Sequence, residues 1–217
     1  MSDGNARIKY LGFVAHEIKN PLATALWGIE LLKRMEGEAR SGPRLEKIVD
    51  ASTRSLNRMR RLVEDYFTIE RLRLGSFDLR AETLQLRTLV ATAVAQLAEK
   101  DGIPAERFSL DVPEQLSVRG NAELLRRALR GALETLARSA AEVRIAISGH
   151  GGEGRALLVL RGEGLPRPLV PLTPEERPTG DQSGGVLGFL LCESVWAAHG
   201  GSIEENEEGL LLRLPEA

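Results

Sequence analysis

The sequence predicts an α+β protein, in which an antiparallel helical hairpin is followed by a mixed β-sheet with helices packed on one face. Three observations lead to this prediction: apolar residues recur at 3-4 spacing up to about residue 74, a Ser-Gly-Pro break interrupts that repeat, and short strand-like runs begin near residue 76. We therefore expect two domains, at 1–75 and 76–217. A chain of 217 residues with 42% apolar content can form one or two small cores.

The hairpin is expected to consist of helices at about 5–40 and 44–74. Pro43 suits the first turn of the second helix, and Gly75 suits the position just after its end. Two apolar stripes that face each other leave apolar surface open, so a second copy should close a four-helix bundle. The stripes are Ile8, Leu11, Val14, Ile18, Leu22, Ala25, Ile29 and Leu32, and Leu45, Ile48, Ser52, Leu56, Met59, Val63, Tyr66 and Ile69.

The second domain is expected to alternate strands and helices. The order of its elements favours a mixed sheet. We predict strands at 77–84, 108–112, 143–148, 156–161, 201–204 and 209–214, and helices at about 89–99, 122–140 and 186–199.

The turn that contains His16 combines the residue types that a phosphorylation site needs. Imidazole is nucleophilic near pH 7, and the adjacent Glu17 is long enough to accept a hydrogen bond from one ring nitrogen and stabilise the cation formed on attack. Asn20 lies one turn further on the same face, where its amide can position a water or a phosphoryl group. Pro21 cannot donate to the carbonyl of Glu17, so a kink is expected there.

Other roles for His16 are less well supported. It lies off the apolar stripe, so it should face solvent or a visiting protein. A zinc site of the H-E-x-x-H type is excluded because position 20 is asparagine. No metal site is expected.

The run His16-Glu17-Ile18-Lys19-Asn20-Pro21-Leu22 resembles the phosphoacceptor box of two-component sensor histidine kinases. The resemblance extends over nearly the whole chain. It implies that 1–75 is a dimerisation and histidine phosphoacceptor domain. It also implies that 76–217 is a two-layer α/β sandwich like the ATP-binding domain of that family.

The nucleotide boxes of that family are poorly matched in the second domain. The run 131–136 lacks both asparagines of N-L-L-x-N-A, so Thr135, a poorer magnesium ligand, replaces the second one. Gly162 stands where D-x-G-x-G has its adenine-binding aspartate, and Glu163 could replace it only after a register shift. Arginines at 126, 127 and 130 would surround Thr135 with positive charge.

The third box, G-x-G-L-G-L, and the lid before it also depart from the pattern. In Gly184-Gly185-Val186-Leu187-Gly188-Phe189, a β-branched valine replaces a glycine and would crowd a phosphate. The lid, between 166 and 184, holds five prolines and no phenylalanine or tyrosine, which makes it a poor gate. The degenerate nucleotide site is expected at Thr135, Gly162, Glu163, Gly164, Gly185 and Gly188.

These departures favour a histidine phosphotransferase that needs no ATP and no other cofactor. His16 would exchange phosphoryl with the aspartate of a response regulator receiver domain, or receive it from an upstream histidine kinase, supported by Glu17 and Asn20. Two alternatives stay open. One is an ATP-dependent autokinase that uses Mg-ATP in a divergent pocket. The other is a non-catalytic dimeric scaffold that regulates a partner kinase or regulator.

Composition and charge exclude several classes of protein. A net charge of −2 gives no basic field for nucleic acid, and the apolar runs are too short to cross a bilayer. The N-terminus is no signal peptide, and a start at Met1 favours a complete, soluble, cytoplasmic protein. Cys192 is expected to be a buried, inert thiol. The arginines of the second helix form either a solvated face or a docking surface for an acidic partner.

Overall fold

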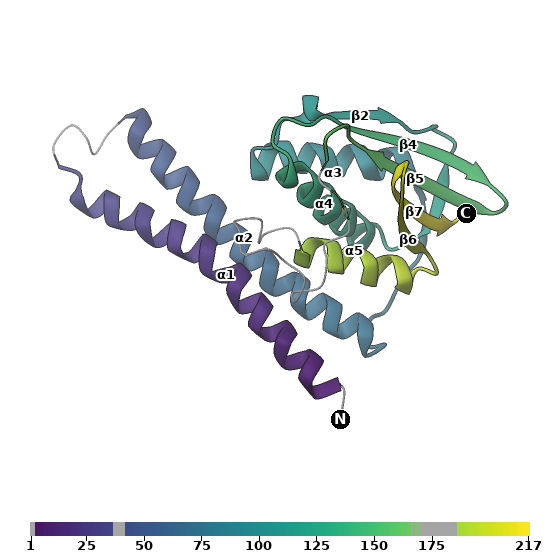
Figure 1. Cartoon of the computed structure of the whole chain (residues 1–217), viewed down its shortest axis with the longest axis horizontal. Helices are drawn as coiled ribbons and strands as arrows, with labels where there is room; N and C mark the ends of the chain where they lie inside the picture. Colours follow the sequence, from purple (N-terminus) through teal and green to yellow (C-terminus); the bar gives the residue numbers. More distant parts are fainter. Residues whose placement is uncertain (1–2, 37–41, 166, 168, 170–185) are drawn as a thin grey trace. The chain divides into compact units, whose positions relative to one another are not determined.

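A computed structural model describes residues 3–36, 42–165, 167, 169 and 186–217 (Figure 1). The chain divides into two compact units, Met1–Tyr66 and Phe67–Ala217. The predicted domains at 1–75 and 76–217 stay a prediction. The α+β class is confirmed, because a helical region precedes a sheet-based unit.

The first unit is built on two long helices, α1 (Asp3–Arg34) and α2 (Pro43–Arg73). Pro43 opens α2 as predicted, and Gly75, with φ of 63°, follows the end of that helix. The predicted extension of α1 to residue 40 is wrong, since Met35 and Glu36 lie beyond the helix. The sequence reaches Gly37 directly afterwards, and glycine is a poor helix former.

Within the first unit, α1 and α2 approach closely at Gly28. A Cβ atom at this position would lie 2.1 Å from Ser52 Oγ, so a larger residue would require the Ser52 side chain to shift. Ala25 and Ser52 are buried at this crossing. A second set of apolar side chains on both helices stays exposed, and it comprises Leu22, Leu26, Ile29, Val49, Leu56 and Val63.

The second unit contains a five-stranded mixed sheet in the order β2-β4-β5-β7-β6, whose helices lie on one face (Figure 1). Only β2 and β4 pair in parallel, and the other neighbours are antiparallel. The strands are β2 (Phe108–Asp111), β4 (Ile145–Gly152), β5 (Arg155–Arg161), β6 (Ser202–Asn206) and β7 (Gly209–Pro215). The helices are α3 (Leu86–Asp101), α4 (Ala122–Ser139) and α5 (Val186–Ala198), and a short 3-10 helix covers Ala105–Arg107.

A separate two-stranded sheet joins β1 (Glu82–Gln85) to β3 (Ser117–Gly120) in antiparallel register. The strand predicted at 77–84 is therefore mostly wrong. Phe77 instead lies under the guanidinium of Arg71, 4.6 Å from the ring centroid. Strand β3 was not predicted, because Val118 is its only large apolar residue.

Side chains complete the ends and the interior of the helices in this unit. Asn121 caps α4 by accepting a hydrogen bond from the Leu124 amide. Arg107 donates to the Ala140 and Val143 carbonyls just after the end of α4. Arg130 in α4 forms a buried ion pair with Asp101 at the end of α3, at 2.5 Å.

No helix among the described residues is long and apolar enough to cross a bilayer.

Candidate functional site

The turn predicted to carry phosphoryl lies in an unbroken stretch of α1, which continues through Pro21 to Arg34. Asn20 is exposed and Pro21 is buried. The side chains of His16 and Glu17 lie outside what the structure describes. Helical periodicity places positions 16, 20, 23 and 27 on one face.

That face is open at every position whose side chain is described. Asn20 and Ala23 are exposed, and 65% of the surface of Trp27 is accessible. A partner protein can therefore approach α1 along this side. The apolar stripe at Leu22, Leu26 and Ile29 lies on a different face of the helix.

The position that matches the adenine-binding aspartate is filled by apolar side chains. A Cβ atom on Gly162 would lie 2.7 Å from Leu165 Cδ1 and 2.8 Å from Val143 Cγ1. Leu165 is itself buried, and its amide donates to the Gly162 carbonyl across a tight turn. Gly164 has φ of 83°, the positive value that the third position of a type II turn requires. Glu163 sits at the exposed tip of this turn, away from any buried position.

Gly188, one of the two glycines retained from the third box, makes a helix contact. A Cβ atom on Gly131 in α4 would lie 2.7 Å from the Gly188 carbonyl oxygen in α5. Thr135, one turn along α4, donates its hydroxyl to the Gly131 carbonyl at 2.8 Å. Two of the predicted positions, Thr135 and Gly188, therefore lie at or near one tightly packed crossing of α4 and α5, together with Gly131.

The arginines expected around Thr135 have other partners. Arg130 binds Asp101, Arg126 pairs with Glu123 on its own helix, and Arg127 donates to the Thr68 hydroxyl at 3.4 Å. The expectation of a positively charged shell around Thr135 is wrong for Arg130, which is buried in its ion pair with Asp101. Gly185 and the proline-rich lid lie outside the described residues, apart from Arg167 and Leu169.

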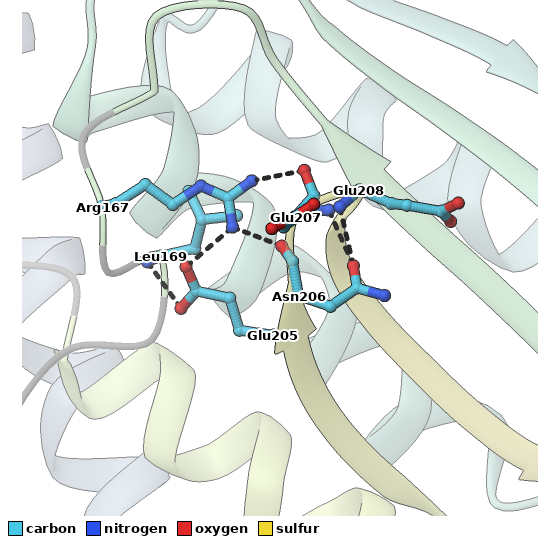
Figure 2. Close-up of polar contacts among 7 residues, drawn as sticks. Arg167, Leu169, Glu205, Asn206, Glu207 and Glu208 are labelled. Atoms are coloured by element: carbon cyan, nitrogen blue, oxygen red, sulfur yellow. Dashed lines mark hydrogen bonds and ion pairs between the residues drawn. The ribbon is translucent and has the colours of Figure 1, made fainter.

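Arg167 and Leu169 are held against the turn between β6 and β7 (Figure 2). The guanidinium of Arg167 donates to Glu205 Oε1 at 3.1 Å, to the Glu207 carbonyl at 3.0 Å and to the Asn206 carbonyl. The Leu169 amide donates to the other oxygen of Glu205 at 2.8 Å. Glu205 thus fixes two points of the segment that follows β5.

Two further residues from the sequence prediction have structural roles. Cys192 is fully buried as predicted, and burial, together with the negative charge of Glu193, raises the pKa of its thiol well above the ordinary value. His199 follows the end of α5, where its Nε2 accepts a hydrogen bond from the backbone N–H of Asn121 at 3.0 Å. Its Nδ1 lies 2.7 Å from the Val195 carbonyl, so Nδ1 carries the proton.

A groove of about 740 Å³ opens at the other end of α4, beside β1. It could not be predicted from the sequence, because its lining residues match none of the nucleotide boxes. Its polar lining includes Arg80 and Arg126 as well as Glu82 and Glu123, so its charges are balanced. None of the described positions predicted for the nucleotide site lines this groove.

Comparisons with known proteins match the helical hairpin on its own and, in full-length relatives, most of the chain. The family described as the His Kinase A (phospho-acceptor) domain matches residues 6–75, a range that contains the His16 turn. Sensor protein KdpD of Escherichia coli is 27% identical over 201 residues, which cover 89% of this chain and 22% of KdpD. Sensor histidine kinase MtrB of Mycobacterium tuberculosis is 28% identical over 231 residues, covering 97% of this chain and 39% of MtrB.

Over most of its length the chain is similar to two-component sensor histidine kinases, and residues 6–75 match the phosphoacceptor domain of that family. It spans well under half the length of these curated relatives. The fold agrees with solved structures of this histidine kinase family. The histidine kinase AdeS of Acinetobacter baumannii gives a TM-score of 0.64 at 16% identity, covering 92% of this chain and 97% of AdeS. Histidine kinase ThkA, solved in complex with response regulator protein TrrA, gives 0.56 at 19% identity, covering 100% of this chain and 62% of that one.

Proposed function

We propose that this chain is a histidine phosphotransferase that exchanges phosphoryl between His16 and the aspartate of a response regulator receiver domain, without using ATP. The proposal that the transfer does not use ATP rests on a single observation, the crowding at Gly162. Leu165 and Val143 occupy the space that a side chain at this position would need. The family's adenine-binding carboxylate therefore has no counterpart here, and a side chain at this position would have to displace Leu165 and Val143.

The transfer step needs only groups on the two proteins. A neutral ring nitrogen of His16 attacks the phosphorus of the aspartyl phosphate, a P–N bond forms, and the P–O bond to the aspartate breaks. The carboxylate leaves as an anion, and the reverse reaction returns the phosphoryl group. Glu17 would hold the proton on the other ring nitrogen and stabilise the imidazolium, as an acid does beside a catalytic histidine. Asn20 would position the phosphoryl group or a water.

The site would work in a homodimer. Leu22, Leu26 and Ile29 on α1 follow 4-3 spacing and stay exposed, and Val49, Leu56 and Val63 on α2 repeat every seven residues and stay exposed as well. Such spacing is typical of helices that associate along a seam. A second copy of the hairpin that covers these side chains would complete a four-helix bundle.

The fit of Mg-ATP to the second unit is poor at Thr135, Glu163 and Gly188. Thr135 uses its hydroxyl to bond the Gly131 carbonyl, and Gly188 is packed against Gly131. Glu163 is exposed at the tip of its turn. We therefore derive no step through a bound nucleotide. In this proposal the sandwich serves as a structural domain.

The test uses the protein with two phosphoryl donors. In one arm it is incubated with labelled Mg-ATP. In the other arm it is incubated with purified receiver domains of the source organism, each phosphorylated with acetyl phosphate. We expect acid-labile, base-stable label from a receiver and none from ATP, and we expect His16→Gln to abolish all labelling.

Each other outcome assigns a different function. Label from ATP that depends on His16 would overturn the ATP-independent part and indicate an autokinase. If no receiver exchanges phosphoryl with the wild type, the transfer itself is contradicted. In that case, a His16→Gln variant that keeps its biological activity would identify a scaffold.

A further inference from the structure

Strand β1 pairs on one side only among the described residues, with β3 in the two-stranded sheet. Just beyond the last paired position, the Leu86 amide donates to the Leu116 carbonyl at 2.9 Å. Backbone groups alternate in direction along an antiparallel pair. Those of Leu84 therefore point towards β3, and those of Thr83 point away from it. The outer edge of β1 is open.

Strand β3, in contrast, has a partner on both sides. Its Ser117 lies opposite Gln85 in the register, but the Ser117 carbonyl accepts from the Ala217 amide at 3.2 Å. Gln85 thus faces outwards, as Thr83 does. The amides of both residues and the carbonyl of Thr83 have no backbone partner in the part of the chain that the structure describes. An edge of this kind can pair with another strand.

The groove of about 740 Å³ lies along this edge. Thr83 and Gln85 line it, and Thr88, Leu89 and Thr92 of α3 line it as well. The groove thus combines unpaired backbone groups of a strand with hydroxyl and apolar side chains of a helix. An extended peptide uses both, because its main chain needs hydrogen-bond partners and its alternate side chains need a surface to pack on.

The charges of the lining indicate which side chains the occupant should carry. Arg80 pairs with Asp78 at 3.3 Å, and Arg126 pairs with Glu123. Glu82 is then the one charged residue of the lining that has no ion-pair partner among those the structure describes. Its carboxylate complements a lysine or arginine of a partner.

Arg126 has hydrogen-bond donors left for the backbone of such a peptide. A guanidinium carries five N–H donors, and Glu123 is the acceptor that the described residues provide. The Nε of Arg126 is buried without a hydrogen-bond partner in the described part of the chain, which costs free energy. Because 29% of the side chain is accessible, a carbonyl oxygen of a bound peptide can reach this guanidinium.

We propose that the groove beside β1 binds an extended, cationic peptide segment of a partner protein. The segment pairs with the outer edge of β1 and places a lysine or arginine next to Glu82. The sandwich then has a docking role as well as a structural one. This role is independent of the phosphotransfer proposed for His16, so a failure of either leaves the other intact.

The probe is a fluorescein-labelled hexapeptide of alternating valine and lysine with blocked ends. A comparison peptide has glutamate in place of lysine. Binding to the full chain is followed by fluorescence anisotropy. We expect the lysine peptide to bind and the glutamate peptide to bind more weakly. Glu82→Gln should weaken binding of the lysine peptide about two- to fivefold, the size of an exposed ion pair.

The matched variants Thr83→Pro and Thr83→Ala separate the backbone from the side chain. Proline removes the outward N–H, and at this position of an edge strand it leaves the hydrogen bonds to β3 in place. Thr83→Pro should therefore bind the lysine peptide about tenfold more weakly or worse. Thr83→Ala keeps the N–H and should bind like the wild type. Both variants should unfold at the wild-type midpoint.

Hydrogen exchange at the Thr83 amide gives a second measurement that needs no variant, and it decides the question if Thr83→Pro fails to fold. This amide should exchange rapidly in the free protein and slowly with the lysine peptide bound. Slow exchange in the free protein would show that a second copy already covers the edge, and would overturn the proposal. Three other results would also overturn it: no binding of either peptide, equal binding of both, or wild-type affinity in a folded Thr83→Pro.

Discussion

The candidate functional positions are exposed on the hairpin and packed in the sandwich. On α1 the residues that share the face of His16 are exposed, including Asn20 and Trp27. In the sandwich the positions that match a nucleotide site are packed, with Leu165 against Gly162 and α5 against Gly131. An exposed surface is available to a binding partner. Apolar side chains that pack around a position make dispersion contacts with one another and leave no space for a ligand.

The ion pairs of the two regions also differ in their burial. In the sandwich Arg130 and Asp101 form a buried pair, with side-chain exposures of 11% and 2%. On the hairpin the Arg34 and Glu30 pair is largely in water, at 75% and 53%. Breaking a buried pair leaves a charge without its partner in a medium that solvates it poorly, whereas an exposed charge is simply rehydrated.

The largest effect is expected from Asp101→Ala. Removal of this carboxylate leaves the guanidinium of Arg130 buried without its ion-pair partner, and it should lower the free energy of unfolding of the sandwich by about 3–5 kcal/mol. Denaturant unfolding followed by the emission of the buried Trp196 measures this change. The matched control, Glu30→Ala, should cost less than about 1 kcal/mol in the hairpin. Equal losses of unfolding free energy in Asp101→Ala and Glu30→Ala would show that the buried ion pair contributes no more than the exposed one.

A smaller loss is expected from Gly131→Ala, which tests the packed crossing. The added methyl group would lie 2.7 Å from a backbone oxygen of α5, which cannot move aside cheaply. Strain of this kind costs about 1–3 kcal/mol, and alanine regains up to about 1 kcal/mol of helix propensity. We expect a net loss of about 1–2 kcal/mol in denaturant unfolding. Gly152→Ala, where nothing lies within 4 Å of the new atom, is the control and should change stability far less. A stabilised Gly131→Ala variant would show that the crossing is loose.

The hairpin could be predicted from its sequence because a 3-4 repeat of apolar residues carries information along the whole length of a helix. Pro43 and Gly75 mark the start and the end of α2 by local backbone chemistry alone. The apolar repeat does not predict which exposed residue contacts which partner. The exposure of Trp27 became evident only from the folded hairpin.

The sandwich was less predictable where contacts are long-range. Strand β3 has one large apolar residue, so its pairing with β1 depends on tertiary context. Arg130 looks like a surface residue in the sequence, and only the approach of Asp101 from α3 explains its burial. The loss of an aspartate at position 162 is visible in the sequence, but the filling of its space by Val143 is not, because that residue is distant along the chain.

The smallest effect is expected from restoring the missing carboxylate with Gly162→Asp. In an open pocket one new hydrogen-bonding group improves the binding of its ligand by about tenfold or more. Here Leu165 and Val143 already occupy the space next to position 162, so the new side chain meets apolar atoms before it can meet adenine. Calorimetric titration should show no gain in Mg-ATP affinity in this variant, nor in Glu163→Asp, whose side chain lies at the exposed tip of the turn. If Gly162→Asp alone produced clear nucleotide binding, the cleft would be open after all, and the two regions would differ by one residue only. If binding needed Leu165→Gly as well, the packing around Gly162 would be what keeps the nucleotide out.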